Sequence, residues 1–310
     1  MPFTPPAALK PGDTIGIVGI TRWIAPDTLD QVKALWESNG YNVQIHENNY
    51  SHHHEWAGDF KERAAAFTQY WNDPKINAII AARGGNRTLH LLDYIDFDAL
   101  NDTPKIIMGA SDLTALLNAL SHKKNMTTFH GPVASRYAGS GAQKHIDETR
   151  NLLEGQQTTF DLYGAKTLNE GTAEGDLIGG NMCIFNYLLG TEYLPSLKGK
   201  ILFIEDESEE VRNIDRMFLH LKRLGQLDDI AGLMIGGFSD VKNTGSVPFP
   251  YSAEDLFKEY TKGLDIPVIT NAPFGHGQHL MPLPVGTRAQ LDVHKNSASI
   301  KCLTPAVKLS

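Results

Sequence analysis

The first half of the chain alternates between short apolar runs and segments in which apolar residues recur every three or four positions. Residues 14–19, 41–45 and 76–82 have the length and composition of buried parallel strands. The intervening segments 26–39 and 59–71 have the apolar spacing of helices. Strands that alternate with helices predict a parallel sheet with helices on its faces.

A strand–turn–helix unit follows at residues 106–120 and carries a serine at its turn. The apolar run 106–109 leads through Ser111 into a helical pattern that continues to Leu120. A side chain at such a junction stands clear of the sheet, beside helix N–H groups that favour negative charge. We interpret Ser111 as a nucleophile. The alternative is that Ser111 is only the N-cap of the helix, a frequent role for serine.

The pattern weakens between residues 137 and 175 and then resumes. The later strand-like runs are residues 177–181, 200–204, 231–236, 267–269, 288–293 and 298–303, of which the last two predict a closing β-hairpin. We therefore predict an α/β protein with an N-terminal domain at residues 1–140, an inter-domain crossing at 141–174 and a C-terminal domain at 175–310.

A glycine pair follows the strand-like run that ends at residue 82. Gly84 and Gly85 would let the backbone approach a ligand closely and would leave N–H groups available. The segment has neither G-x-G-x-x-G nor G-x-x-x-x-G-K-[ST], so the support for a phosphate cradle is weak. A simple tight turn is the alternative.

Three chemically capable side chains lie just past predicted strand ends: Ser111, Glu205 and His276. In open α/β sheets, ligands gather at the carboxyl ends of the strands. A serine needs an adjacent base, for which His276 is suited, and Glu205 would orient the imidazole and stabilise its cation. Gly275 and Gly277 would leave room for a substrate beside the ring. Taken singly, His276 is also explained as a turn residue and Glu205 as part of a solvated acidic run.

Acyl transfer also requires hydrogen-bond donors for the carbonyl oxygen that becomes negative. We predict that the N–H groups of Asp112 and Gly85 are these donors. The nucleophile-elbow pattern G-x-S-x-G is absent, because Leu113 stands in place of its last glycine. This argues against an ordinary α/β-hydrolase, although that fold shares the order Ser, Glu, His.

Charge and composition narrow the class of partner. The 310 residues carry a net charge of -8, which disfavours a nucleic-acid or anionic-membrane partner. No apolar run is long enough to span a bilayer, and the N-terminus lacks the basic-then-apolar pattern of a secretory signal. The two cysteines, Cys183 and Cys302, do not indicate a disulfide framework. We therefore expect a cytoplasmic protein.

A run of three histidines, His52 to His54, precedes Glu55 and suggests a metal site. Adjacent residues of one chain rarely all reach one ion, and this stretch lies between predicted elements. We therefore favour a polar loop over a metal site.

Seven short motifs occur in order along nearly the whole chain. They are Ala-Arg-Gly-Gly at 82–85, Gly-Ala-Ser-Asp at 109–112, His-Gly-Pro at 130–132, Gly-Gly-Asn at 179–181, Ile-Glu-Asp at 204–206, Ile-Asp-Arg-Met at 214–217 and Pro-Phe-Gly-His-Gly at 273–277. At this spacing the set resembles the LD-carboxypeptidase family of serine peptidases. That family includes muramoyltetrapeptide carboxypeptidases and microcin C immunity peptidases.

The resemblance implies an N-terminal parallel-sheet domain that is Rossmann-like (class I glutamine amidotransferase-like). It also implies a C-terminal mixed α/β domain, with the active site in the cleft between the two. By motif matching, Ser111 takes the place of the nucleophile, His276 of the base and Glu205 of the orienting carboxylate. The amides of Gly85 and Asp112 take the place of the oxyanion hole.

The reaction implied by the resemblance is hydrolysis of an L,D-amide bond with release of a C-terminal D-residue. The typical substrate is a small peptide, the cytoplasmic murein tetrapeptide, which loses D-alanine during cell-wall recycling. The resemblance further implies a reaction without metal or cofactor, and a homodimer.

Some positions depart from the family pattern. Ala110 stands where an aromatic residue is usual, Asn86 stands where an aromatic residue often follows the glycines, and residues 209–212 replace a proline–aromatic segment. These departures affect the expected substrate pocket. Arg83 and Glu209 are candidates for contacting the carboxylate and amine of a zwitterionic peptide, with solvated surface roles as the alternative.

Three hypotheses remain. The first is a serine LD-carboxypeptidase of murein recycling. The second is a peptidase or amidase of the same mechanism that detoxifies a peptide–nucleotide antibiotic. The third is a catalytically silent module that binds a peptide.

Overall fold

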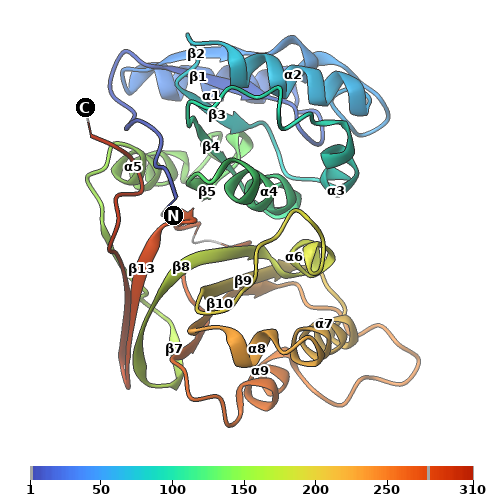
Figure 1. The fold of residues 1–310 in the computed structure, drawn as a ribbon. Helices are drawn as coiled ribbons and strands as arrows, with labels where there is room; N and C mark the ends of the chain where they lie inside the picture. Colours follow the sequence, from blue (N-terminus) through green and yellow to red (C-terminus); the bar gives the residue numbers. More distant parts are fainter. Residues whose placement is uncertain (1–2, 278–279, 310) are drawn as a thin grey trace. The chain divides into compact units, whose positions relative to one another are not determined.

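The chain divides into two compact units, each built around its own sheet (Figure 1). The computed structural model describes residues 3–277 and 280–309. Of these, the first unit takes the residues up to Thr158, Met281–Gly286 and the tail from Pro305. The second unit takes Thr159–Leu280 and Thr287–Thr304. The expected α/β class is confirmed, with one mixed sheet in each unit.

The sheet of the first unit has six strands in the order β12-β5-β4-β3-β1-β2. Five of them are parallel, and β12 pairs antiparallel with β5. Every residue of β3 and β4 is buried, which explains why these strands appear in the sequence as continuous apolar runs. The bounds are Thr14–Val18 (β1), Asn42–Ile45 (β2), Ala78–Ala81 (β3), Ile106–Gly109 (β4), Thr128–His130 (β5) and Leu283–Val285 (β12).

The order of these strands reverses between β1 and β3. The connection from β1 to β2 runs toward one edge of the sheet, and those from β3 through β4 to β5 run toward the other. Since such crossovers are right-handed, α1 lies on one face and α2, α3 and α4 lie on the other. The segments after β1 and β3 therefore flank the topological switch point, where ligands bind in open α/β sheets.

The helices of this unit begin at recognisable signals. Pro26 occupies the first turn of α1, and Asp59 caps α2 in a reciprocal capping box with Glu62, at 2.9 and 2.7 Å. The helices are Pro26–Ser38 (α1), Phe60–Asn72 (α2), Thr88–Leu91 (α3), Thr114–Lys124 (α4) and Ala142–Leu153 (α5). The 3-10 turns are Glu47–Tyr50 (η1), Leu92–Tyr94 (η2), Ser111–Leu113 (η3) and Ala134–Tyr137 (η4).

The sheet of the second unit has eight strands in the order β6-β14-β13-β8-β9-β10-β11-β7. The central strands β8 to β11 are parallel, and the strands on either side of them pair antiparallel. The bounds are Thr159–Asp161 (β6), Lys166–Asn169 (β7), Gly171–Asn181 (β8), Ile201–Glu207 (β9), Gly232–Ser239 (β10), Val268–Thr270 (β11), Arg288–His294 (β13) and Ser297–Cys302 (β14).

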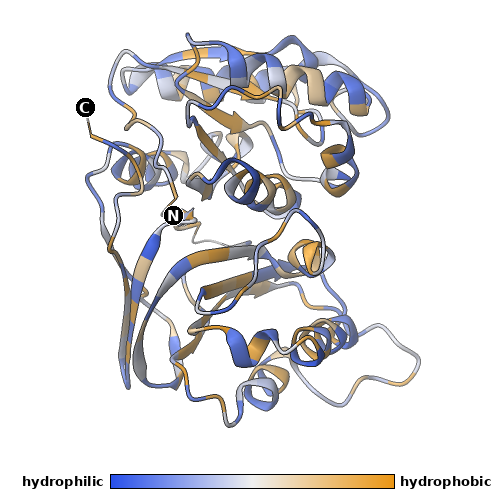
Figure 2. Cartoon of the chain, in the orientation of Figure 1, coloured by the Kyte–Doolittle hydropathy of each residue, from blue (hydrophilic) through white to orange (hydrophobic). Residues whose placement is uncertain are grey.

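Four helices accompany this second sheet. Figure 2 shows the central strands largely hydrophobic and the helices divided between hydrophobic and hydrophilic residues. In α7 the buried residues recur every three or four positions, which gives the helix one apolar face. The helices are Met182–Leu188 (α6), Val211–Arg223 (α7), Gln226–Asp229 (α8) and Ala253–Thr261 (α9).

Strands β8 and β9 approach each other closely at Gly179. A Cβ atom at this position would lie 1.7 Å from the carbonyl oxygen of Phe203, so only glycine fits. This contact explains the first glycine of the Gly-Gly-Asn motif by packing.

The closing hairpin is confirmed as β13 and β14, but three strands were not predicted. Strand β12 has three residues and contains Pro284, so it carries no period-two signal. Strands β6 and β7 lie in the stretch of weak pattern, together with the exposed first part of β8. Strands β6 and β7 are edge strands with mostly exposed or partly exposed residues, so their sequences carry little hydrophobic signal, whereas β12 is buried but too short to show a pattern.

Candidate active site

Ser111 lies in a left-handed turn between β4 and α4. Its φ is +61°, and it is the first residue of η3, which leads directly into the helix. A non-glycine residue in this region is strained by roughly 1 kcal/mol or more. The residue in the N-cap position is Ala110, and no side chain caps the turn. The geometry therefore does not support the alternative in which Ser111 serves only as a helix cap.

The glycine pair after β3 lies against this serine. A Cβ atom on Gly84 would lie 3.1 Å from the Cβ and 3.4 Å from the Oγ of Ser111. A Cβ atom on Gly85 would lie 2.9 Å from Arg22 Cγ and 3.1 Å from Thr21 Cβ. The turn therefore has close neighbours on two sides, and a side chain at either glycine would force one of them to shift.

Two backbone amides near Ser111 are available as donors. Within the described part of the chain, the N–H groups of Gly85 and Asp112 have no hydrogen-bond acceptor. The carboxylate of Asp112 is already engaged, because its Oδ2 accepts the backbone N–H of Thr88 at 2.6 Å. Burial raises the pKa of this carboxyl group, against the hydrogen bonds from Thr88. Asp112 thus anchors the start of α3 with its side chain while its amide is available.

In the second unit, Glu205 and His276 form a tight pair. Glu205 is fully buried near the end of β9, and its Oε2 accepts the backbone N–H of His276 at 3.0 Å. The same oxygen lies 2.6 Å from His276 Nδ1. The segment that carries the histidine is held to β10, because the N–H of Gly237 donates to the carbonyl of Phe274 at 2.9 Å. Nδ1 therefore carries the proton in the neutral imidazole, and Nε2 is the basic nitrogen.

A second carboxylate faces the other nitrogen of this ring. Glu207 Oε2 lies 3.6 Å from His276 Nε2, and the Glu207 side chain is 47% exposed. Burial alone would lower the pKa of His276, but the hydrogen bond and charge of Glu205, with Glu207 and Asp206, outweigh it and raise this pKa. Glu207 was not identified from the sequence as a candidate site residue. The available signal was its period-two relation to Glu205, which places both residues on one face of β9.

Asp206 points to the opposite side of the strand and anchors α6. It accepts hydrogen bonds from Asn181 Nδ2 at 2.8 Å and from the Cys183 N–H at 3.0 Å. Asn181 also caps the helix through its Oδ1. Burial, followed by the charge of Glu205, raises the pKa of Asp206 to about 6. The Ile-Glu-Asp and Gly-Gly-Asn motifs therefore meet at one helix start.

The two candidate substrate contacts have different surroundings. Arg83 is exposed, and its carbonyl accepts the Thr21 hydroxyl at 2.5 Å. Glu209 is partly buried, and its Oε1 accepts the N–H of Glu210 and the side-chain amide of Asn213 at 2.8 and 2.9 Å. One oxygen of Glu209 therefore fixes the start of α7.

The histidine tract forms a tight turn. The backbone groups of His53 and Trp56 bond to each other, His54 is left-handed, and the His52 ring lies 4.2 Å from that of Trp23. Among the residues that the structure describes, no group of three or more His, Cys, Asp or Glu could hold a metal ion. Neither Cys183 nor Cys302 forms a disulfide within the described residues.

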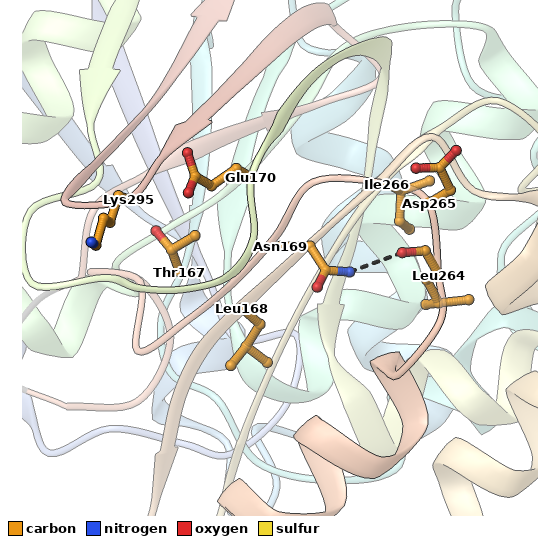
Figure 3. A pocket seen from close by; sticks show the side chains of 8 residues that line it. All are labelled: Thr167, Leu168, Asn169, Glu170, Leu264, Asp265, Ile266 and Lys295. Carbon is orange, nitrogen blue, oxygen red and sulfur yellow. Dashed lines mark hydrogen bonds between the residues drawn. The ribbon is translucent and has the colours of Figure 1, made fainter.

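A polar pocket of about 430 Å³ lies at the edge strand β7 of the second unit (Figure 3). Leu264 and Ile266 line it and precede β11, so the pocket lies at the amino end of this strand. Glu205 and His276 lie at the opposite, carboxyl ends of the parallel strands. The pocket is therefore separate from the Glu205–His276 pair.

Known proteins resemble this chain over nearly its whole length. Residues 15–131 match the LD-carboxypeptidase N-terminal domain, and residues 174–291 match the LD-carboxypeptidase C-terminal domain. A probable murein peptide carboxypeptidase of Bacillus subtilis is 31% identical, over 96% of this chain and 94% of that protein. The chain belongs to the LD-carboxypeptidase family. The expected serine-type carboxypeptidase class is thereby confirmed.

Other family members differ in what their names describe. The microcin C7 self-immunity protein MccF of Escherichia coli is 29% identical over 79% of each chain. The structure of muramoyltetrapeptide carboxypeptidase from Oxalobacter formigenes has a TM-score of 0.81, with 28% identity over 93% of this chain and 98% of that one. The structure of MccF in complex with glutamyl sulfamoyl guanosine has a TM-score of 0.87, with 23% identity over 98% of this chain and 99% of that one. At this identity the likeness shows a shared fold. The expected two-domain α/β fold is confirmed.

Within residues 3–277 and 280–309, no helix is long and apolar enough to cross a bilayer.

Proposed function

We propose that this carboxypeptidase hydrolyses the amide between an L-configured centre and a C-terminal D-residue, releasing D-alanine from murein tetrapeptide. The observation that carries the proposal is the Glu205–His276 pair, in which a buried carboxylate fixes the imidazole through two hydrogen bonds. This is the arrangement by which a histidine is made a directed general base.

Ser111 is the proposed nucleophile. Its Oγ forms a bond to the carbonyl carbon of the L-residue while its proton passes to Nε2 of His276. The tetrahedral adduct then breaks its C–N bond, and Nε2 returns the proton to the leaving amine. A water molecule repeats the sequence on the acyl-enzyme and releases the shortened peptide. Glu205 stabilises the imidazolium in both halves of the reaction.

The amides of Gly85 and Asp112 are the proposed oxyanion donors. Asp112 directly follows Ser111, and Gly85 directly follows Gly84, which lies against Ser111. Both amides lack acceptors within the described residues. One such donor contributes roughly 10²–10³-fold to turnover in enzymes of this chemistry. Two donors would therefore account for a large part of the rate enhancement.

The names of several relatives support the substrate. The Bacillus subtilis protein is described as a probable murein peptide carboxypeptidase, and one of Pseudomonas aeruginosa as a murein tetrapeptide carboxypeptidase. We extend this substrate to the present chain, with Arg83 and Glu209 as proposed contacts for the peptide's carboxylate and amine. We also propose that the protein is cytoplasmic and that it forms a homodimer. Light scattering of the purified protein tests the homodimer.

The deciding experiment combines product analysis with active-site labelling. The purified enzyme is incubated with murein tetrapeptide, and free D-alanine and tripeptide are quantified. A phosphonofluoridate probe is then expected to label Ser111 stoichiometrically, and peptide mapping identifies the modified residue. Full turnover by Ser111→Ala would overturn the mechanism. Cleavage of the tetrapeptide without labelling of Ser111 would move the reaction to another nucleophile.

A second candidate substrate is an aminoacyl-nucleotide conjugate. It is favoured by the similarity to MccF, whose structures include complexes with aspartyl sulfamoyl adenosine and glutamyl sulfamoyl guanosine. The departures at Asn86, Ala110 and residues 209–212 favour it as well, since they change the expected pocket. Parallel assays with tetrapeptide and conjugate distinguish the two substrates, and intact conjugate after prolonged incubation would eliminate the second.

A further inference from the structure

Asn86 directly follows the glycine pair and is hydrogen-bonded on both sides of its amide. Its Oδ1 accepts the indole N–H of Trp56 at 2.8 Å, and its Nδ2 donates to Glu55 Oε1 at 3.0 Å. The indole can only donate and the carboxylate can only accept. These partners therefore fix the orientation of the Asn86 amide, which has a single satisfactory arrangement.

The hydrogen-bond network continues from Asn86 to Arg22, whose side chain lies against Gly85. Glu55 Oε2 pairs with Arg22 at 2.6 Å, and the Cγ of Arg22 would lie 2.9 Å from a Cβ atom on Gly85. The backbones of Arg22 and Trp56 also form an antiparallel bridge. The contacts thus run from Asn86 through Glu55 to Arg22, and Arg22 lies against Gly85, the residue that precedes Asn86. We call the set Arg22, Glu55, Trp56 and Asn86 the Asn86 brace.

The members of the Asn86 brace differ in strength. The Arg22 and Glu55 side chains are 38% and 42% exposed, so their ion pair is screened and contributes little to stability. The hydrogen bond from Asn86 is the leading cause that lowers the pKa of Glu55, ahead of the charge of Arg22. We therefore expect the Trp56–Asn86 hydrogen bond to be the main restraint, since neither partner is a mobile, charged chain end.

The glycine turn is held between this brace and the serine. Gly84 faces Ser111, with 3.1 Å from its Cβ position to Ser111 Cβ, while Gly85 faces Arg22 and Thr21. Thr21 Oγ1 also donates to the carbonyl of Arg83 and fixes the start of the turn. The peptide plane shared by Gly85 and Asn86 carries the Gly85 carbonyl, whereas the Gly85 N–H belongs to the preceding plane, which starts at Gly84. Because Gly84 lies against Ser111, a displacement of Asn86 must be taken up by the φ and ψ of Gly85, which redirects the Gly85 N–H.

We propose that Asn86 and Trp56 are positioning residues that hold the Gly85 N–H in place as an oxyanion donor. The proposal rests on the proposed function. Oxyanion donors act because they are preorganised, and the direction of each N–H bond depends on the side chains that support the donor. Asn86 is one of the positions that depart from the family pattern, and Trp56 is its partner from a distant part of the sequence.

The test compares Trp56→Phe, which keeps the ring but removes the donor, with Asn86→Ala and the double variant. Each single variant is expected to lower kcat by about tenfold to hundredfold, less than the loss of a whole donor, with KM within about twofold. Phosphonylation of Ser111 should slow by a similar factor, because it develops charge on the same oxygen. The double variant should be no slower than the slower single variant.

His53→Ala is the matched control. It removes another ring near Trp56, at 6.3 Å between centroids, without touching the Asn86 hydrogen bonds, and is expected to leave kcat unchanged. Unchanged kcat and phosphonylation in Trp56→Phe and Asn86→Ala would overturn the proposal. A rise in KM alone would also overturn it, by making the two residues substrate contacts. Failure of the wild-type enzyme to cleave peptide or to be labelled would instead count against the proposed function.

Discussion

Gly275 and Glu205 are in closer contact than any other residue type at position 275 would permit. A Cβ atom on Gly275 would lie 2.5 Å from Glu205 Cβ and 2.8 Å from its Oε2, and the glycine has a φ of +97°. The approach lets the next residue, His276, place both its N–H and its Nδ1 on one carboxylate oxygen. The sequence interpretation gave Gly275 the task of leaving room for substrate. That interpretation was wrong, because the space beside Gly275 is filled by Glu205.

Gly275→Ala is expected to lower the free energy of unfolding by about 2 kcal/mol or more and to reduce kcat. The methyl group would overlap a buried side chain in a backbone region that disfavours it. Thermal unfolding and steady-state kinetics measure the two effects. Gly277→Ala is the stability control, because a Cβ atom there would meet nothing within 4 Å. Equal stability losses in both variants would contradict the argument.

Ser111→Gly is expected to be more stable than Ser111→Ala by about 1 kcal/mol while both are inactive. Glycine relieves the left-handed strain at φ +61°, whereas alanine keeps it. Turnover should fall by at least about 10⁴-fold in each, since both lack the nucleophile. Denaturant unfolding of the matched pair isolates the strain. A less stable glycine variant would show that the turn is not strained.

The kcat/KM of the enzyme is expected to rise with pH through the pKa of His276, because the neutral imidazole is the base. The neighbouring carboxylates raise this pKa above its ordinary value, so the acid limb lies above pH 6.5. Glu207→Gln removes one raising charge and should move the limb to lower pH, and solvent screening keeps the effect small because the Glu207 side chain is half exposed.

NMR titration of the His276 ring measures the same shift without turnover. Asp240→Asn is a suitable control, because Asp240 is exposed and pairs with Lys242. A Glu207→Gln profile that is unchanged, or moves to higher pH, would exclude an electrostatic effect of Glu207 on the base.

Asp206 should make the enzyme less stable as the pH rises from about 4 to about 6. Its pKa is raised from 3.8 to about 6 in the fold, so the folded state binds the proton more tightly. The free energy of unfolding therefore falls as this proton is lost. Urea unfolding at several pH values should show this slope in the wild type and its loss in Asp206→Asn.

Asp240→Asn provides the contrast, because the pKa of Asp240 is lowered, first by its hydrogen bond to Lys242. Its stabilising contribution is present above the unfolded pKa and is lost as the pH falls. The difference from wild type should thus have the opposite sign. The same slope in wild type and Asp206→Asn would contradict the assignment to Asp206.

The candidate catalytic residues could be found from the sequence because ligands in open α/β sheets bind at the carboxyl ends of the strands. This criterion needs only the positions of the strands. Ser111, Glu205 and His276 each follow or end a buried apolar run, and such runs are visible without tertiary contacts. The pair geometry of Glu205 and His276 was expected, and the structure has it. Whether these residues and Ser111 perform the reaction remains a prediction.

The sequence did not reveal which acidic residues face the imidazole. Residues 205–210 contain five carboxylates, and their orientation depends on where β9 ends. With Glu207 still in the strand, alternation places it beside Glu205 and turns Asp206 away. Trp56 was missed for a similar reason, because its bond to Asn86 joins residues 30 positions apart. Such contacts depend on tertiary packing and leave no local pattern.

Neither unit is a continuous piece of chain. The chain leaves the first unit after Thr158, returns for β12, and returns again for the final residues, where the Lys308 carbonyl accepts the N–H of Ala8. A gene truncated at the first boundary would encode a sheet without its antiparallel edge strand and without this tail. Recombination that exchanges a single contiguous cassette cannot transfer either unit intact. Chimaeras with other family members would need four coordinated junctions, after residues 158, 280, 286 and 304.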